Sequence, residues 1–338
     1  MSRLMTEPSA TQEDQQFLAL LVHRGFFAKA DAVRILQSVS DKGFTSTVLA
    51  ATGWDVKKLN YLRQTKGLLE PVIPGFEDTE RVGTGGTADV FRARRSKDFS
   101  TVALKVLLPR LALDPPSVKR FLEEGRMLQS LDHPAIVSGH RIFKFMDTYI
   151  LEMDFVPGKT LEEILDEGEP IDEETALSVV LQAARALEYL RTQEIVHRDM
   201  KPGNLMLKPD GNIILIDLGF AGAGMEGRVS EDSTLGTPSY LAPEQALGDE
   251  SLDARADIYS LGVTLYHLVM GSLPFTGESE GEVMRKQILE GLKGSAMKGR
   301  DISPRMHYII EKMMAKDREM RYSSPAELVE DLEAMGPS

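Results

Sequence analysis

The sequence has 338 residues, a formal net charge of −13 at pH 7 and no cysteine. The lack of cysteine excludes disulfides, thiolate metal sites and thiol catalysis, and the acidic charge argues against a general nucleic-acid-binding protein. A chain of this length can form two domains or one large domain with two lobes.

No targeting segment is visible in the sequence. The first residues are polar and acidic and lack the apolar region of a secretory signal. The longest mostly apolar run, residues 258–273, is interrupted by Ser260, Thr264 and His267 and is too short to span a bilayer comfortably. We therefore expect no membrane span and a cytoplasmic protein.

Residues 1–10 are small and polar and are expected to be disordered. Residues 11–75 are expected to form a small all-α domain of unknown role, because apolar residues recur at helical spacing from about residue 12 to 69. A glycine followed by an aromatic residue ends an apolar run at both Gly25 and Gly53, which indicates a duplicated helix–turn–helix unit. A regulatory module and a helical extension packed on the rest of the chain are equally compatible with this pattern, and no partner can be named.

Pro74 and Gly75 break the helical pattern and mark a domain boundary. The following stretch, residues 80–93, places glycines between two strand-like runs, where backbone N–H groups can approach phosphates without a Cβ in the way. A dinucleotide-binding turn would need a helix directly after the glycines. Strands are expected there instead, at residues 90–94 and 101–106, which disfavours that alternative.

Lys105 lies among apolar residues of the second of these strands. An unpaired ammonium group is expensive in such a place, so a carboxylate partner is expected. The next helix, predicted to start at Ser117 after two prolines, offers Glu123 and Glu124. Glu124 shares the i, i+4, i+7 spacing with two leucines and so lies at the edge of the inward face, whereas Glu123 points further out. We predict that Lys105 pairs with Glu124.

The rest of the chain continues with strands at residues 142–145 and 149–153 and helices at residues 173–191, 254–270 and 325–335. Strands come first and helices dominate afterwards.

Polar residues gather at the ends of short apolar runs in the second half of the chain. Asp199, Lys201 and Asn204 lie within residues 196–204, and Asp217 follows a second apolar run. Loops in such positions can present side chains to a ligand.

Taken in order, these features resemble the protein kinase family, and in particular the bacterial eukaryotic-like Ser/Thr kinases. The likeness is carried by the glycine turn, Val102-Ala103-Leu104-Lys105, Glu124, His197-Arg198-Asp199, Asn204, Asp217-Leu218-Gly219 and Ala242-Pro243-Glu244. It covers about residues 76–338 and implies an α+β fold, the two-lobed kinase fold, with a small β-rich N-lobe at about 76–155 and a larger helical C-lobe at about 156–338. Ala88 and Leu218 depart from the family pattern, at the third glycine and at the phenylalanine after the metal-binding aspartate, and we expect activity to survive both changes.

The resemblance implies an ATP- and Mg²⁺-dependent enzyme that transfers the γ-phosphate to serine or threonine hydroxyls of proteins. It assigns Asp199 as the base, Lys201 as a γ-phosphate contact, and Asn204 and Asp217 as Mg²⁺ ligands. Lys105, held by Glu124, would contact the α- and β-phosphates. The remaining nucleotide contacts that it implies are Val82, Gly83, Thr84, Gly85, Gly86, Val90, Ala103, Met153 as the gatekeeper, and the backbone groups of Asp154 and Val156.

The resemblance also assigns residues around the substrate and in the lower lobe. Asp257 would brace the catalytic loop, and Arg321 would be the partner of Glu244. Thr237 together with Lys201 is typical of Ser/Thr specificity, and it would form part of the peptide platform.

Arg198, beside the base, is a cation that needs an anion. A phosphate on the activation segment would supply one. The candidate phosphorylation sites are Thr234, or else Ser233 or Ser230.

Two alternatives remain open at this point. A pseudokinase scaffold would lack one of Lys105, Asp199 or Asp217, and all three are present. A small-molecule kinase of related fold would not need residues 236–244, which build a peptide platform in protein kinases. Transfer of labelled phosphate that is lost in Asp199→Asn separates an enzyme from a scaffold.

Overall fold

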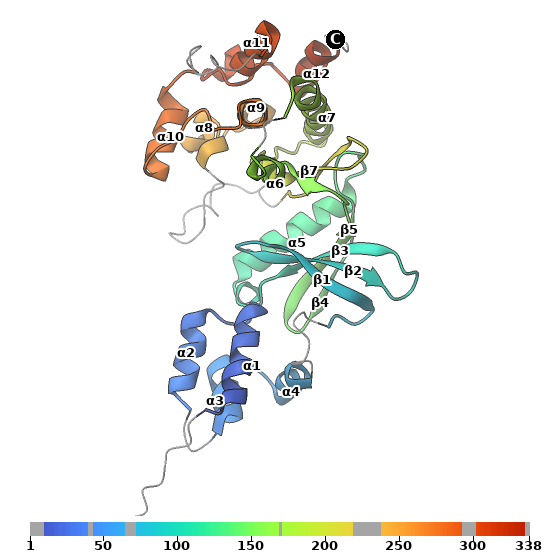
Figure 1. Ribbon diagram of the computed structural model, residues 1–338, viewed down its shortest axis with the longest axis vertical. Helices are drawn as coiled ribbons and strands as arrows, with labels where there is room; N and C mark the ends of the chain where they lie inside the picture. Colours follow the sequence, from blue (N-terminus) through green and yellow to red (C-terminus); the bar gives the residue numbers. More distant parts are fainter. Residues whose placement is uncertain are drawn as a thin grey trace, which may run out of the picture. The chain divides into compact units, whose positions relative to one another are not determined.

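The structure is a computed structural model that describes residues 10–39, 43–64, 72–168, 171–218, 238–292 and 302–334. The chain divides into two compact units. The first comprises residues 1–126 and 139–155, and the second comprises residues 127–138 and 156–338. Figure 1 shows both units and labels most of their helices and strands.

Four helices, here called the N-terminal helices, open the first unit: α1 (Gln12–His23), α2 (Lys29–Gln37), α3 (Gly43–Thr52) and α4 (Val56–Gln64). A capping box starts α1, since the Thr11 hydroxyl accepts the Asp14 N–H while the Asp14 carboxylate accepts the Thr11 N–H. Left-handed glycines follow α1 and α3, Gly25 with φ 72° and Gly53 with φ 69°. The expected helix–glycine–helix pattern therefore occurs twice. Residues 65–71, which follow α4, lie outside the described residues.

The apolar faces of these helices enclose a core of their own. Its buried members include Phe17, Leu18, Leu21, Ile35, Val48, Leu59 and Leu62. Trp54 is half-buried at the edge of this core and stacks on Phe27 with ring centroids 5.3 Å apart.

A five-stranded antiparallel sheet follows, in the order β1-β2-β3-β5-β4. Its strands are β1 (Phe76–Thr84), β2 (Ala88–Arg95), β3 (Thr101–Leu107), β4 (Gly139–Phe145) and β5 (Thr148–Asp154). One face carries an apolar core that includes Phe76, Phe91 and Leu104. On the other face, helix α5 (Pro115–Ser130) packs so closely on β4 that a Cβ at Gly125 would lie 2.6 Å from Ile142 Cδ1.

The predicted start of α5 at Ser117 is wrong, because the helix begins at Pro115. Proline is tolerated in the first helical turn, where its missing N–H has no intrahelical acceptor. The Asp114 carboxylate accepts the Ser117 N–H at 2.9 Å and so caps the turn that contains both prolines.

The second unit is mainly helical. Its helices and strands are β6 (Lys159–Thr160), α6 (Leu161–Asp166), α7 (Glu173–Thr192), β7 (Leu205–Leu207), β8 (Ile213–Leu215), α8 (Pro243–Ala246), α9 (Ala254–Met270), α10 (Glu280–Leu289), α11 (Pro304–Met313) and α12 (Pro325–Glu333). Short 3-10 turns lie at η1 (Leu111–Leu113) in the first unit and at η2 (Pro202–Asn204), η4 (Pro238–Tyr240) and η5 (Arg318–Met320) in the second.

Helix α9 forms the core of the second unit and spans the residues predicted from its apolar pattern. It begins at the N-cap Asp253 and ends at the left-handed Gly271, and nearly all of its residues are buried. Strands β6, β7 and β8 form a separate small antiparallel sheet. The mixed α+β class expected from the sequence is confirmed.

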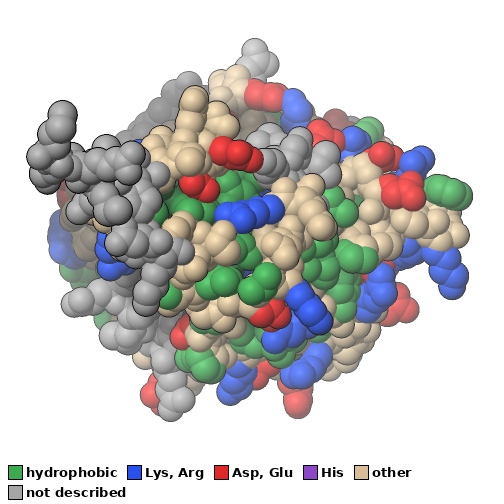
Figure 2. Space-filling view, turned by 90° about the horizontal axis from the view of Figure 1, so that it is seen from below, with side chains coloured by type: hydrophobic (Ala, Val, Ile, Leu, Met, Phe, Trp, Pro, Cys, Tyr) green, Lys and Arg blue, Asp and Glu red, His purple; other side chains and the backbone are tan. Residues whose placement is uncertain are grey.

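Within the residues that the structure describes, no helix is both long enough and apolar enough to cross a bilayer. On the face shown in Figure 2, acidic and basic side chains are interspersed with apolar ones. Among the described side chains of this face, no large patch of purely acidic or purely basic residues is visible.

Candidate active site

The glycine-rich turn joins β1 to β2 in the first unit. Gly85 donates its N–H to the Ala88 carbonyl at 2.9 Å, which closes the turn, and Val82 at its start is 48% exposed. We call residues 82–88 the glycine loop. The predicted contacts Gly83, Thr84 and Gly86 lie within it, and Arg110 donates to the Gly86 carbonyl at 2.9 Å. The loop thus presents backbone groups at the end of a twisted hairpin.

The next predicted contacts lie side by side on three neighbouring strands. Val90 on β2 is opposite Lys105 on β3, and Ala103 on β3 is opposite Met153 on β5. Ala103 and Met153 are buried. Asp154 ends β5, and its carboxylate lies 2.7 Å from His140 Nε2. These strands form an apolar surface that carries the ammonium group of Lys105.

Lys105 Nζ lies 2.5 Å from Glu124 Oε1, and the two side chains are only 11% and 6% exposed. Glu123 is exposed on the other side of α5, where it lies 3.8 Å from Lys119. The glutamate that faces inward is therefore Glu124, as the spacing of apolar residues on this helix predicts. A close pair with so little exposure holds the lysine in one position while its charge is compensated.

In the second unit, the loop of residues 196–204, here called the Asp199 loop, is braced from below by α9. The Asp257 carboxylate accepts the N–H groups of His197 and Arg198 at 2.8 and 2.7 Å. Complete burial raises the pKa of Asp257, and the two N–H donors oppose that shift. The brace expected from the family resemblance is present.

His197 ties the Asp199 loop to the residue after β8. Its Nδ1 lies 3.1 Å from the backbone nitrogen of Asp199, and its Nε2 lies 2.7 Å from the Asp217 carbonyl oxygen. Because a backbone N–H can only donate and a carbonyl can only accept, the ring is neutral, with its proton on Nε2. The buried histidine is thus a structural bridge, and both of its nitrogens are engaged.

The Asp199 carboxylate is the centre of the loop. Its Oδ2 lies 2.8 Å from Lys201 Nζ and 3.0 Å from Asn204 Nδ2, and the same amide nitrogen donates to the Asp199 carbonyl at 2.7 Å. The contacts from Lys201 Nζ and Asn204 Nδ2 thus meet at one carboxylate oxygen, Oδ2. They fix the side chain so that Oδ1 can meet an incoming hydroxyl.

Asn204 and Asp217 come together because β7 and β8 pair as a hairpin. Leu205 is opposite Leu215, and Ile216 donates its N–H to the Asn204 carbonyl at 3.0 Å. Both predicted metal ligands therefore lie at the same end of the hairpin.

The residues present fit a divalent cation that is shared with phosphates. Among the described residues, no group of three or more histidine or acidic side chains is close enough to hold a metal alone. Magnesium in phosphoryl-transfer sites takes only one or two protein ligands and completes its shell with phosphate and water oxygens. The side-chain amide nitrogen of Asn204 donates to Asp199. The side-chain amide oxygen, Oδ1, is therefore the Asn204 atom suited to a cation.

Arg198 adopts a left-handed conformation with φ 69°, and within the described chain its buried Nε has no hydrogen-bond partner. Its carbonyl accepts from Gln245 Nε2 at 2.9 Å. Gln245 is a positioning residue that the sequence analysis missed, because a lone glutamine after a kinase-like motif carries no signal. The predicted Thr237, Thr234, Ser233 and Ser230 lie outside the described residues. Val156 is the first residue of the second unit's long segment and is buried.

Comparison with known proteins decides the family. A family profile described as "Protein kinase domain" matches residues 76–332. The chain belongs to the protein kinase family. The resemblance stated from the motifs is therefore confirmed.

Named kinases are similar to this chain over the same region. The probable serine/threonine-protein kinase SCO3848 of Streptomyces coelicolor is 36% identical over 263 residues, which are 75% of this chain and 38% of that protein. The serine/threonine-protein kinase PknB of Mycolicibacterium smegmatis is 35% identical over 265 residues, 76% of this chain and 42% of that protein. A probable serine/threonine-protein kinase of Clostridium perfringens, CPE1738, is 33% identical over 259 residues, 76% of this chain and 38% of that protein. The chain spans about two fifths of the length of these relatives.

Proposed function

We propose that this protein kinase transfers the γ-phosphate of ATP to serine or threonine hydroxyls of proteins. The observation that supports this most directly is the Asp199 carboxylate, held at one oxygen by Lys201 and Asn204. The names of the relatives, all serine/threonine-protein kinases, point to the same acceptor class. We assign residues 76–155 as the N-lobe, residues 156–338 as the C-lobe and residues 11–75 as a separate helical domain.

The chain's own residues divide the work. Asp199 Oδ1 orients the acceptor hydroxyl and takes its proton as the hydroxyl oxygen bonds to the γ-phosphorus, while the bond from that phosphorus to the bridging oxygen of the β-phosphate breaks and ADP leaves. Lys201 stabilises the negative charge that develops on the transferred group, and Lys105 holds the α- and β-phosphates, itself held by Glu124. The glycine loop covers the phosphates with backbone N–H groups, while Ala103, Met153 and the backbone of Asp154 and Val156 receive the adenine. When bound, MgATP supplies the phosphoryl group, and its Mg²⁺ ion neutralises part of the negative charge of the phosphates.

Transfer of ³²P from labelled ATP to dephosphorylated casein tests the proposal. Asp199→Asn and Lys105→Met should each lower turnover by about 10²-fold or more, because removal of one positioned charge costs that much in comparable sites. Asp210→Asn is the matched control. It neutralises an aspartate between β7 and β8 that pairs only locally with Lys208, so turnover should be unchanged.

A wild-type chain that binds ATP without transferring phosphate would instead be a scaffold. Transfer to small hydroxyl compounds but to no protein would favour a small-molecule kinase.

We propose that Mg²⁺ is the cation and that Asn204 and Asp217 hold it. Removal of divalent ions with EDTA should abolish transfer, and added Mg²⁺ should restore it. Asn204→Ala should raise the Mg²⁺ concentration that gives half-maximal activity. Asn212→Ala, which changes an exposed asparagine on the same hairpin, should not.

We further propose that phosphorylation of the activation segment raises activity through Arg198. The buried Nε of Arg198, which has no partner among the described residues, supports an anion there. Thr234, Ser233 and Ser230 are the candidates, and Thr237 would contribute to acceptor selection. Alanine at each candidate, followed by turnover measurements on phosphatase-treated and autophosphorylated protein, tests this. Unchanged activity in all three variants would contradict it.

A further inference from the structure

The N-terminal helices contact the kinase sheet within the first unit, and one contact lies at the base of the glycine loop. Arg81, the residue before this loop, donates both terminal nitrogens to the His23 carbonyl at 3.2 Å. His23 is the last residue of α1, 58 positions earlier in the chain.

The end of α1 is built to receive such a cation. Phe26 donates its N–H to the Leu21 carbonyl at 2.9 Å, and Gly25 donates to the Val22 carbonyl at 3.0 Å. These two bonds form a Schellman cap, which uses the carbonyls of Leu21 and Val22. The His23 carbonyl is one of the helix's remaining acceptors, and it lies at the negative end of the helix dipole. A guanidinium group fits that position in charge and in geometry.

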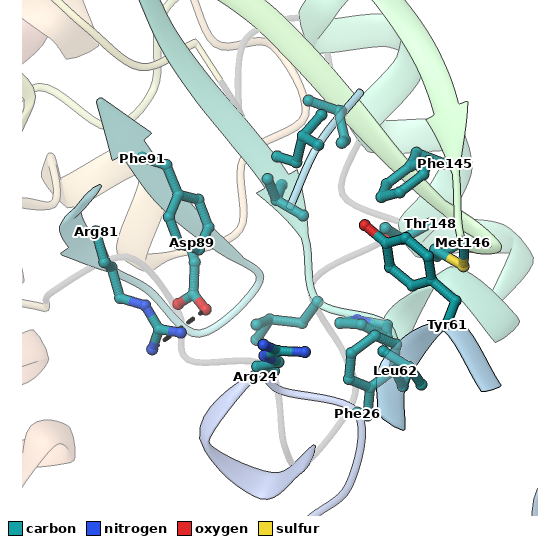
Figure 3. A pocket seen from close by; sticks show the side chains of 15 residues that line it. Arg24, Phe26, Tyr61, Leu62, Arg81, Asp89, Phe91, Phe145, Met146 and Thr148 are labelled. Atoms are coloured by element: carbon teal, nitrogen blue, oxygen red, sulfur yellow. Dashed lines mark ion pairs between the residues drawn. The ribbon is translucent and has the colours of Figure 1, made fainter. Parts of the chain in front are cut away.

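Arg81 also reaches across the hairpin that carries the glycine loop. Its Nη1 lies 3.7 Å from the Asp89 carboxylate on β2, and its guanidinium lies 5.3 Å from the centre of the Phe91 ring. The Arg81 and Asp89 side chains are 14% and 10% exposed. The two residues flank the glycine loop, so this ion pair closes its base, as Figure 3 shows.

A second contact leads to the same loop. A Cβ added at Gly25 would lie 2.9 Å from Leu108 Cδ2, so α1 ends directly against Leu108. The Leu108 N–H donates to the Thr87 carbonyl of the glycine loop at 2.9 Å. The end of α1 therefore contacts Arg81, which precedes the loop, and Leu108, which is hydrogen-bonded to Thr87 near the end of the loop.

The helices are fastened to the sheet at a separate point by Lys58 of α4. Its Nζ lies 3.3 Å from the Asp147 carboxylate in the β4–β5 turn and 4.3 Å from the centre of the Trp54 ring. Lys58 is buried, which lowers its pKa, and Asp147 opposes that shift. Nearby, Tyr61 packs edge-on against Phe145 with ring centroids 5.8 Å apart.

A mostly apolar cavity lies between the two fastening points. Arg24, Phe26, Tyr61 and Leu62 line it from the helices, and the sheet side includes Phe91, Val106, Phe145 and Thr148 (Figure 3). The interface is therefore held at its margins and is not packed throughout, which suits a contact whose strength can be altered.

We propose that Arg81 is a positioning residue through which the N-terminal helices hold the glycine loop and so set the affinity for ATP. This rests on the proposed kinase function. The N-terminal helices act as an intramolecular effector. When they are docked on the sheet, they fix the base of the glycine loop, and when this contact loosens, the loop gains freedom to move.

The test uses the full chain with Arg81→Ala, Lys58→Ala and the double variant. Each single change should raise the KM for ATP about fivefold, the lower end of typical coupling between sites, and leave kcat and the KM for casein within about twofold. If the helices act through Arg81, Lys58→Ala should add almost nothing in the Arg81→Ala background. Multiplying effects in the double variant, or an unchanged KM for ATP in both single variants, would overturn the proposal.

The matched control for Arg81 is Arg92→Ala. Arg92 lies on the same hairpin and pairs with Glu80 at 2.6 Å, at a position where both side chains are about half exposed. Asp147→Asn removes the Lys58 contact from the sheet side and keeps a residue that tolerates the left-handed φ of 62°, so it should reproduce Lys58→Ala. Arg81→Lys keeps a charge for Asp89 but loses the two-pronged contact, and an intermediate KM is expected.

Hydrogen exchange separates a failure of this inference from a failure of the kinase assignment. Amides of residues 82–88 should exchange faster in Arg81→Ala and in Lys58→Ala than in wild type, without nucleotide present. If wild type transfers no phosphate while these amides respond, the kinase function fails and the coupling stands. If transfer is normal and exchange in residues 82–88 is unchanged, the coupling fails.

Discussion

The Asp199 loop and the contact between the N-terminal helices and the sheet both join segments far apart in sequence, but they are built differently. In the loop and in the helix that braces it, buried groups make two bonds each: Asp257 of α9 accepts two N–H groups and His197 uses both ring nitrogens. The helix contact depends on a few side chains at the margins, chiefly Arg81 and Lys58, around a cavity.

This difference predicts different responses to mutation. A buried group that loses its partner stays away from water and bears the full cost of desolvation. In the helix contact, the Asp147 partner of Lys58 is 65% exposed and can recover much of that cost from solvent. Removal of one group from the C-lobe network should therefore destabilise the whole network. Each removal from the helix contact should instead cost a smaller and separate amount of stability.

The largest effect is expected at the pair formed by Glu244 and Arg321. Arg321 is fully buried at its side chain, holds both Glu244 carboxylate oxygens and donates to the Ala315 carbonyl at 2.7 Å. Arg321→Met should lower the free energy of unfolding by about 3–5 kcal/mol, because it leaves a carboxylate buried and alone. Urea denaturation followed by circular dichroism measures this.

Arg191→Met provides the matched control. Arg191 makes an equally close two-pronged contact with Glu188, but its side chain is 48% exposed. Its loss should cost less than about 1 kcal/mol. Equal losses in the two variants would show that burial does not separate these pairs.

The next effect concerns the brace under the Asp199 loop. In Asp257→Asn, one amide oxygen replaces two carboxylate oxygens, and an NH₂ group faces a backbone N–H. One buried donor is left unsatisfied, so we expect a loss of about 1–3 kcal/mol in stability and a fall in kcat of about tenfold or more. The KM for ATP should change little, which distinguishes this variant from Arg81→Ala. A raised KM with normal kcat would contradict the assigned role.

The Asp199 loop could be predicted from the sequence because its chemistry needs fixed residue types at fixed spacing. Asp199, Lys201 and Asn204 lie within six positions of each other, and strand pairing brings Asp217 back to them. The spacing on α5 also sufficed to choose Glu124 over Glu123. Here local periodicity and the required chemistry agree.

The helix contact could not be predicted in the same way. Arg81 and Lys58 are ordinary surface residue types, and their partners are a backbone carbonyl and a turn aspartate that no motif marks. Gln245 was missed for the same reason. The start of α5 was misplaced because proline is compatible with both a helix start and a preceding turn.

A pH effect is expected in the C-lobe at Lys316. Its ammonium lies 4.3 Å from the centre of the Phe275 ring and donates to Tyr259 Oη and the Gln287 carbonyl, both at 2.7 Å. Burial lowers the pKa of Lys316 to about 7, and Arg321 adds to the shift. Between pH 7 and about 10 the unfolded chain therefore binds more protons at this residue than the folded chain, and the free energy of unfolding rises with pH.

Partial exposure reduces the size of this effect, and we expect about 1–2 kcal/mol over that window. Lys316→Met should remove this part of the pH slope, measured by urea denaturation at pH 7 and pH 9.5. A slope as steep in the variant as in wild type would assign the dependence to other groups.

The smallest effect is expected at Lys58 and bears most directly on the comparison. Lys58→Ala removes a contact with a half-buried tryptophan and an ion pair whose aspartate is 65% exposed, so the loss of stability should be about 1 kcal/mol. Hydrogen exchange should then quicken in α1 to α4 and stay unchanged in α7 and α9, because the C-lobe core has its own network. Lys57→Ala, which changes the exposed lysine one position earlier on α4, controls for loss of charge and helix propensity and should change neither. If Lys58→Ala speeds exchange equally in α9, the two regions unfold together, and the helices are part of one cooperative kinase fold and not an element that can loosen by itself.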